Sequence, residues 1–295
     1  MEKKVSAVIT GIHRGGTTWF GSLFNCLESV SVIHEPFNYN HGIVGVPRWY
    51  LGPTDEEFLF SSLEKISSGN AVFKRPFLKH AALRSVAKMI LGSGAEAIYN
   101  NSMASSSSEL YLKDPFLIKT TGKLISKGIK VIVIVRHPAA VFQSLKRLEW
   151  QNSLKNLVFN TDNLPRFETP LGAEHYMAKL WNELYSDLSK CADSVDSNNL
   201  FLINHEAFFS DVHKNCMKLF RFLELESHIE QMLAYGLETT SAKVVTPSGR
   251  DVHVLSRNSQ ELKNSWRLSI SNESLSVFET ECGGLYRKIL ESCDI

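Results

Sequence analysis

The sequence has few cysteines and no long apolar run. Its five cysteines are scattered through 295 residues without a Cys-x-x-Cys pair, so neither a disulfide framework nor a zinc site is indicated. No stretch of about eighteen apolar residues could cross a membrane, and Met1 to Lys4 lead directly into a strand pattern without a signal peptide. We therefore expect a cytoplasmic protein in a reducing compartment, with no stable membrane insertion.

The sequence also lacks an excess of either charge. Lys and Arg number 32 and Asp and Glu number 31, which gives a formal net charge of +1. Surfaces that bind nucleic acid or anionic membranes usually carry a basic excess, so we expect no nucleic-acid partner, although local basic pockets are compatible with this balance. The ten histidines form no His-Glu-x-x-His spacing, and we expect no metal. The oligomeric state is left open, a homodimer included.

The N-terminal segment joins a strand pattern to a glycine-rich turn and a helical pattern. A β-branched run over 5–10 leads into Gly11 to Thr18, and apolar residues then recur at helical spacing over 17–27. Glycines allow a tight turn that presents several backbone N–H groups to one anion. The helix that follows directs the positive end of its dipole toward the same point. The sequence thus predicts a phosphate-binding loop between a strand and a helix.

This loop nearly matches a Walker A motif but lacks its lysine. Gly11 and Gly16 have the Walker separation, and Thr18 stands at the hydroxyl position. Thr17 occupies the lysine position, and Arg14 is the only cation of the loop. A P-loop nucleotide kinase is therefore disfavoured, because that lysine normally reaches the β- and γ-phosphates.

A second apolar strand pattern, at 130–135, ends in a cation. A nucleoside triphosphatase usually places an Asp there to hold Mg²⁺, but here Arg136 follows the strand. A cation at this position indicates that the protein itself binds a second anionic group, without a metal. The helix predicted over 139–150 carries Ser144 about two turns from its start, where its hydroxyl can reach the same anionic group. Two separated anion sites predict a nucleotide with phosphates at both ends.

These two motifs resemble those of sulfotransferases that use 3′-phosphoadenosine-5′-phosphosulfate (PAPS). The resemblance implies a 5′-phosphosulfate loop and a separate 3′-phosphate site, with PAPS as co-substrate and no metal. It also implies that Trp19 stacks on the adenine and that Arg257, in a covering loop over 239–267, closes over the 3′-phosphate. The cofactor-binding residues that the resemblance implies are Arg14, Gly15, Gly16, Thr17, Thr18, Trp19, Arg136, Ser144 and Arg257.

The same resemblance assigns catalytic roles at two other strand ends. Several carbohydrate and bacterial members have a Glu-Pro sequence whose Glu is the general base, and Glu35 matches it, with His34 as the alternative base. Lys113 matches a strand-end lysine near the transferring sulfonate, where Arg14 would also act. The alternatives are a polar strand exit at Glu35 and a solvated Lys113 beside a helix-capping Asp114.

The order of these patterns predicts an α/β fold. We expect a single domain over 1–295 with a central parallel sheet flanked by helices, a three-layer sandwich like that of P-loop NTPases. Strand patterns lie at 5–10, 30–37, 110–115, 130–136 and 199–206, and helical patterns at 55–66, 78–91, 171–195 and 271–290.

Segment 38–108 is the least regular part of the sequence. Four aromatic residues near its start, Phe37, Tyr39, Trp49 and Tyr50, either line an acceptor pocket or cover the sheet edge. Because the donor and the core account for the rest of the chain, we expect this insertion to select the acceptor.

The predicted function is transfer of a sulfuryl group from PAPS to a hydroxyl or amine, with release of adenosine 3′,5′-bisphosphate (PAP). The acceptor is a small molecule or a carbohydrate, and the sequence does not say which. A P-loop nucleotide kinase and a non-catalytic nucleotide sensor are the alternatives.

Overall fold

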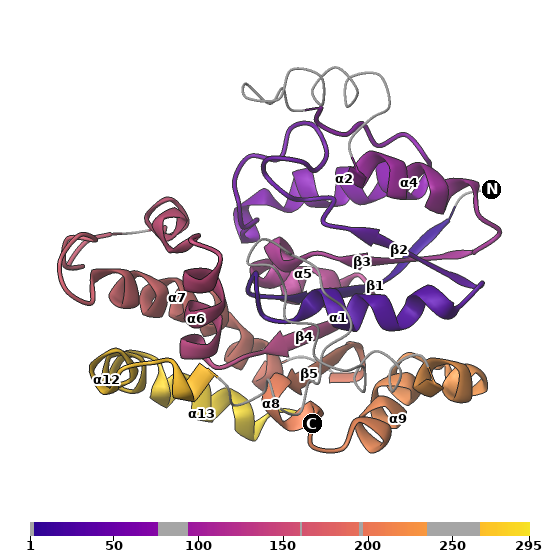
Figure 1. Ribbon diagram of the computed structural model, residues 1–295. Coiled ribbons are helices and arrows are strands. Elements are labelled where there is room, and N and C mark those ends of the chain that lie inside the picture. Colours follow the sequence, from indigo (N-terminus) through magenta and orange to yellow (C-terminus); the bar gives the residue numbers. More distant parts are fainter. Residues whose placement is uncertain (1–2, 76–93, 160, 195–196, 235–265) are drawn as a thin grey trace.

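Five parallel strands form one sheet in the order β2-β3-β1-β4-β5 (Figure 1). The computed structural model describes residues 3–75, 94–159, 161–194, 197–234 and 266–295. The strands are β1 (Lys4–Gly11), β2 (Val30–His34), β3 (Glu109–Lys113), β4 (Lys130–Val135) and β5 (Leu200–Asn204). They lie where the apolar runs predicted them, so the expected α/β fold with a central parallel sheet is confirmed.

Helices cover both faces of this sheet and so make three layers (Figure 1). Strand β4 illustrates the cause, because it is apolar at successive positions rather than at alternate ones. Val131 and Val133 pack into one core, and Ile132 and Ile134 pack into the other. A strand buried on both faces needs cover on both.

The two cores are closed by different sets of helices. On the face toward Val131 these are α2 (Glu56–Ser67), α4 (Gly94–Ala104), α5 (Thr121–Ser126), α6 (Pro138–Arg147), α7 (Gly172–Ser194), α12 (Asn272–Glu281) and α13 (Gly283–Glu291). On the face toward Ile132 they are α1 (Thr17–Ser22), α8 (His205–Phe208) and α9 (Val212–Phe222).

The helices depart from the sequence expectations in three places. The helix expected over 17–27 is α1 followed by a tighter 3-10 turn, Leu23–Cys26. The helix expected over 271–290 is divided at Cys282 into α12 and α13, because the adjacent Gly283 and Gly284 favour a break. Helix α4 was not predicted, and the helix expected over 78–91 lies outside the described residues.

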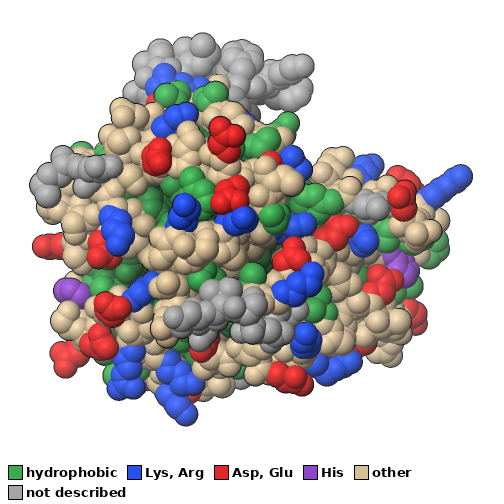
Figure 2. Space-filling view, turned by 180° about the vertical axis from the view of Figure 1, so that it is seen from behind, with side chains coloured by type: hydrophobic (Ala, Val, Ile, Leu, Met, Phe, Trp, Pro, Cys, Tyr) green, Lys and Arg blue, Asp and Glu red, His purple; other side chains and the backbone are tan. Residues whose placement is uncertain are grey.

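The surface seen from behind mixes both charges. Lys and Arg side chains are interspersed with Asp and Glu on this face, in keeping with the net charge of +1 (Figure 2). Within the described ranges, every helix is too short or too polar to span a bilayer.

Candidate active site

The carboxyl ends of all five strands meet at one large cavity. Because the strands are parallel, the segments that leave them gather at the same edge of the sheet. The residues that line the cavity there include Arg14 after β1, Glu35 after β2, Pro115 after β3, Arg136 after β4 and His205 after β5. The cavity has a volume of about 1240 Å³, which is large enough for a nucleotide together with a second substrate.

The loop after β1 turns tightly at its glycines. The backbone N–H of Gly15 donates to the carbonyl of Ile12 at 2.8 Å. Gly16 has a φ of 102°, and a Cβ there would lie 2.6 Å from Cδ2 of His205. Only glycine satisfies both constraints, and the backbone N–H groups of the loop then lead into the start of α1.

A buried tyrosine fixes the base of this loop to the neighbouring strand. The hydroxyl of Tyr185 in α7 accepts from the N–H of Ile12 at 3.1 Å and donates to the carbonyl of Ile134 at 2.7 Å. Burial raises the pKa of Tyr185, so the hydroxyl keeps its proton. The loop is thus held against β4, whose end carries Arg136.

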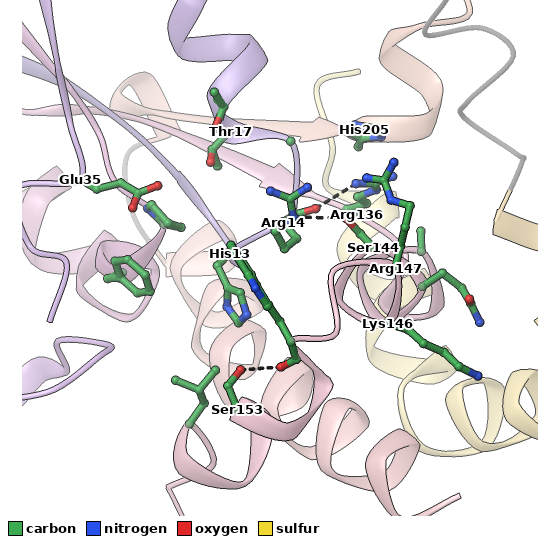
Figure 3. Close-up of a pocket in the computed structure, with 18 of the residues that line it drawn as sticks. His13, Arg14, Thr17, Glu35, Arg136, Ser144, Lys146, Arg147, Ser153 and His205 are labelled. Carbon is green, nitrogen blue, oxygen red and sulfur yellow. Dashed lines mark hydrogen bonds between the residues drawn. The ribbon is translucent and has the colours of Figure 1, made fainter. Parts of the chain in front are cut away.

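Arg14 connects the two predicted phosphate motifs. Its Nε donates to Oγ of Ser144 at 3.2 Å, and Arg136 donates to its carbonyl oxygen at 2.9 Å (Figure 3). Its guanidinium also lies 5.8 Å from the ring centre of Trp150. Arg14 has a φ of 65°, an uncommon conformation for a residue with a side chain. Arg14, Arg136 and Ser144, which come from separate motifs, therefore form one cluster.

Arg136 has an unused hydrogen-bond donor. Its Nε is buried and has no hydrogen-bond partner among the described residues, which is costly unless a ligand supplies an acceptor. Burial lowers the pKa of Arg136, and the nearby Arg147 adds to this effect, whereas Glu206 opposes it. Arg147 approaches from α6 on the cavity side (Figure 3). This end of the cavity is thus built to receive negative charge.

The aromatic side chain expected at the adenine packs edge-on in an aromatic cluster. The ring centre of Trp19 lies 4.9 Å from that of Phe209 and 5.6 Å from that of Phe208. Trp19 nevertheless lines the cavity, and its Nε1 is buried without a hydrogen-bond partner in the described part of the chain. The ring centre of His205 lies 5.2 Å from that of Phe209. Burial lowers the pKa of His205 well below the usual range, so its imidazole is neutral.

Glu35 and Lys113 form an ion pair at the other end of the cavity. Nζ of Lys113 lies 2.5 Å from Oε1 of Glu35, and Asn38 donates to Oε2 at 2.9 Å. Lys113 is only 2% exposed, and its stem crosses Gly21 of α1, where a Cβ would lie 2.9 Å from Cγ of the lysine. Lys113 is therefore buried and paired, which contradicts its interpretation as a solvated charge.

Asp114 has a structural role at this strand end. Its carboxylate accepts from the N–H of Phe37 at 2.6 Å and from that of Phe116 at 3.0 Å. Burial, with the charge of Glu35, raises the pKa of Asp114 to about 7. Asp114 thus caps the 3-10 helix Pro115–Thr120, which is one of the alternatives expected for it. Its hydrogen bond from Phe37 also connects this helix to the segment after Glu35.

His34 faces a different space from the large cavity. His34 lines a smaller cavity of about 340 Å³, whereas Glu35 and Lys113 line both this cavity and the large one. Of the two expected bases, Glu35 is therefore the one that faces the same cavity as Arg14. Arg257 lies outside the described residues.

Arg147, Asn38 and His205 also line the cavity but were not among the predicted site residues, although their spacing from predicted residues or strands indicates them. Arg147 lies three positions after Ser144, and Asn38 lies three positions after Glu35. His205 directly follows β5, as the other site residues follow their strands. Among the described residues, no group of three or more His, Cys, Asp and Glu side chains could hold a metal ion.

The fold is a parallel sheet whose carboxyl ends open on a cavity lined in part by Arg14, Arg136 and Arg147. A family model described as sulfotransferase domain matches residues 5–288. The chain therefore belongs to the sulfotransferase domain family. The comparison with curated proteins gave no match.

Several solved structures resemble this chain at low sequence identity. The sulfotransferase domain of the Synechococcus PCC 7002 olefin synthase is 16% identical, with 95% of this chain and 94% of that chain covered and a TM-score of 0.45. The sulfotransferase domain from the curacin biosynthetic pathway is 13% identical, with coverages of 94% and 98% and a TM-score of 0.44. Mouse sulfotransferase SULT7A1, complexed with PAP, is 11% identical, with coverages of 97% and 87% and a TM-score of 0.47.

Proposed function

We propose that this protein transfers a sulfuryl group from PAPS to a hydroxyl or amine of a small-molecule or carbohydrate acceptor and releases PAP. The observation that carries the proposal is the layout of the cavity. Arg136, Ser144 and Arg147 lie at one end, Glu35 lies at the other, and Arg14 and Thr17 lie between them (Figure 3). This layout suits a donor with a phosphate at one end and a reacting group at the other.

In this proposal the protein binds and aligns the donor rather than activating it covalently. The N–H groups of Gly15 to Thr18 would hold the 5′-phosphosulfate, with the hydroxyls of Thr17 and Thr18 adding hydrogen bonds. Arg136, whose Nε lacks a partner among the described residues, would bind the 3′-phosphate with Ser144. Trp19 and the neutral His205, which line the cavity, would border the adenine.

Glu35 is proposed as the general base. As the acceptor oxygen or nitrogen bonds to sulfur, the bond from sulfur to the 5′-phosphate oxygen breaks, and the acceptor proton moves to the Glu35 carboxylate. Lys113 would stabilise the charge that develops on the leaving phosphate oxygen. Its ammonium is already buried at this point, so little reorganisation is needed.

Acceptor selection is proposed for the start of segment 38–108. Asn38, His41 and Trp49 line the cavity near Glu35, and the ring of Trp49 lies 5.3 Å from that of Phe116. An aromatic wall beside polar side chains suits an acceptor with a flat or hydroxylated face.

The two alternatives predict different ligands. A nucleotide kinase should prefer ATP with Mg²⁺, but β4 ends in Arg136, where such enzymes usually carry the metal-binding carboxylate. A nucleotide sensor should bind PAP without turnover. The ion pair between the buried Lys113 and Glu35, which lines the cavity, favours catalysis over this alternative.

The test is to incubate the protein with ³⁵S-labelled PAPS and a panel of sugars, phenols and amines, and to measure labelled product and PAP together. Stoichiometric formation of both supports the proposal. Transfer from γ-labelled ATP with Mg²⁺ would support the kinase, and PAP binding without turnover on any acceptor would support the sensor.

A further inference from the structure

Asn38 is held in one orientation by its own hydrogen bonds. Its side-chain oxygen accepts from the N–H of Asn40 at 3.0 Å and from that of His41 at 3.2 Å. The amide cannot turn over without losing both bonds, so its nitrogen must face the other way. That nitrogen donates to Oε2 of Glu35 at 2.9 Å.

The backbone around Asn38 is equally constrained. Its N–H donates to the carbonyl of Glu35 at 3.1 Å, and its own carbonyl accepts from the N–H of Gly42 at 2.8 Å. A Cβ on Gly42 would lie 2.2 Å from the carbonyl oxygen of Pro36 and 2.7 Å from the nitrogen of Asn38. The turn closes only with glycine at position 42, which fixes Asn38 relative to the end of β2.

Glu35 therefore has a separate donor on each carboxylate oxygen. Lys113 occupies Oε1 and Asn38 occupies Oε2. The two donors, one on each oxygen, fix the plane of the carboxylate. Asp114 and His13 are further titratable groups that the charge of Glu35 affects: burial raises the pKa of Asp114 and lowers that of His13, and the charge of Glu35 raises both. The φ of Glu35 is 51°, an uncommon backbone conformation that the turn maintains.

We propose that Asn38 is a positioning residue that keeps the Glu35 carboxylate ionised and directed into the cavity. The role of Glu35 as base rests on the proposed function, whereas the effect of Asn38 on the ionisation of Glu35 does not. Donors to a carboxylate favour its charged form, and a fixed plane keeps the reacting oxygen aligned.

The sharpest variant is Asn38→Asp. Its carboxylate can still accept from the N–H groups of Asn40 and His41, so the turn is kept, but an oxygen replaces the donor that faces Glu35. Two carboxylates at hydrogen-bond distance resist double ionisation. The control is Asn40→Asp, which adds the same charge at an exposed position of the same turn. Asn38→Ala removes the donor without adding charge and serves if the Asp variant does not fold.

Two readouts separate this proposal from the proposed function. In a ¹³C NMR titration of the Glu35 carboxyl, assigned with Glu35→Gln, we expect the midpoint to rise by about one pH unit or more in Asn38→Asp. A smaller rise is expected in Asn38→Ala and no resolved change in Asn40→Asp. In turnover assays, the acid limb of the pH profile should move to higher pH, as the midpoint does. The decrease in kcat should be at most about tenfold, and KM should be unchanged.

An unchanged Glu35 titration in both Asn38 variants would overturn the proposal, whatever the activity. A rise in acceptor KM alone would also overturn it and make Asn38 an acceptor contact. A shifted titration in a protein that transfers no sulfuryl group would instead keep the proposed effect of Asn38 and refute the proposed function.

Discussion

Nζ of Lys113 lies 2.5 Å from Oε1 of Glu35, although the two residues are 78 positions apart in the sequence. The register of the sheet brings them together, because His34 of β2 pairs with Lys113 of β3 and Glu35 comes next. The N–H of Glu35 also donates to the carbonyl of Lys113 at 2.8 Å. The ion pair is therefore a direct product of two neighbouring parallel strands.

If Glu35 and Lys113 act as a unit, the losses of activity caused by replacing each residue should not be additive in free energy. We expect Glu35→Gln and Lys113→Met each to lower kcat by roughly 10²- to 10⁴-fold. The double variant should be little worse than the poorer single variant. Single-turnover assays with labelled PAPS measure all three variants, and PAP titration checks that Glu35→Gln, which removes no phosphate contact, still binds the product nucleotide. Fully multiplicative losses would mean that the two residues act independently.

Arg147 should recognise the 3′-phosphate. It has no ion-pair partner in the described part of the chain and extends toward Arg136, whereas its neighbour Lys146 points away (Figure 3). We expect Arg147→Ala to weaken PAP binding about tenfold, equivalent to about 1.4 kcal/mol, and to leave AMP binding unchanged because AMP lacks that phosphate.

Lys146→Ala is the matched control for Arg147→Ala, since it removes an exposed cation from the same helix. Calorimetric titration with PAP and AMP should show a PAP-specific loss for Arg147→Ala only. Equal losses of affinity for the two nucleotides, or in the two variants, would mean that Arg147 contributes only general positive charge and does not recognise the 3′-phosphate.

His137 should make stability depend on acid pH. Its Nδ1 accepts from the N–H of Ala139 at 3.2 Å and so caps α6, which requires an unprotonated nitrogen. Burial lowers the pKa of His137 to about 4. The folded protein therefore holds this imidazole neutral, whereas the unfolded chain protonates it near its ordinary pKa of about 6.5.

The stabilisation from His137 is thus complete above about pH 6.5 and is lost as the pH falls toward 4. The shift amounts to roughly 3 kcal/mol. His137→Asn keeps a capping acceptor without a titrating group, so urea unfolding should show a shallower acid decline for this variant than for wild type. Parallel declines would assign the acid sensitivity to other groups.

Gly21 should tolerate alanine poorly, against ordinary helix propensity. Gly-to-Ala inside a helix usually stabilises by about 1 kcal/mol, but a Cβ at Gly21 would lie 2.9 Å from Cγ and 3.1 Å from Cβ of Lys113. We expect Gly21→Ala to destabilise by about 1 to 2 kcal/mol and to lower kcat by displacing the ammonium.

Gly284→Ala provides the contrast for Gly21→Ala, because a Cβ at this position of α13 meets nothing within 4 Å. It should raise the free energy of unfolding by roughly 0.5 to 1 kcal/mol. Denaturant unfolding of both variants decides the point. A stabilised Gly21→Ala with full activity would show that Lys113 is not confined by α1.

The sequence was informative wherever a local pattern carried the structure. The apolar runs located all five strands, and the strand-end rule placed Glu35, Lys113 and Arg136 at one edge of the sheet. These predictions succeed because buried parallel strands need continuous apolar residues.

Long-range contacts could not be predicted in the same way. The clamp of Tyr185 on the loop after β1 joins residues 173 positions apart, and nothing in the local sequence specifies it. The break between α12 and α13 at Cys282 was not predicted, because the apolar spacing continues across it. Asn38 and Arg147 were overlooked because polar residues in turns and on helix ends are usually solvated.

The proposed function requires that this protein bind its nucleotide through a separate 3′-phosphate site made by Arg136 and Ser144. The most direct measurement is calorimetric titration of the wild-type protein with PAP and with AMP, both in excess EDTA. We expect PAP to bind at least about tenfold more tightly than AMP and Arg136→Ala to remove the difference. Equal affinities for the two nucleotides in the wild-type protein would contradict it.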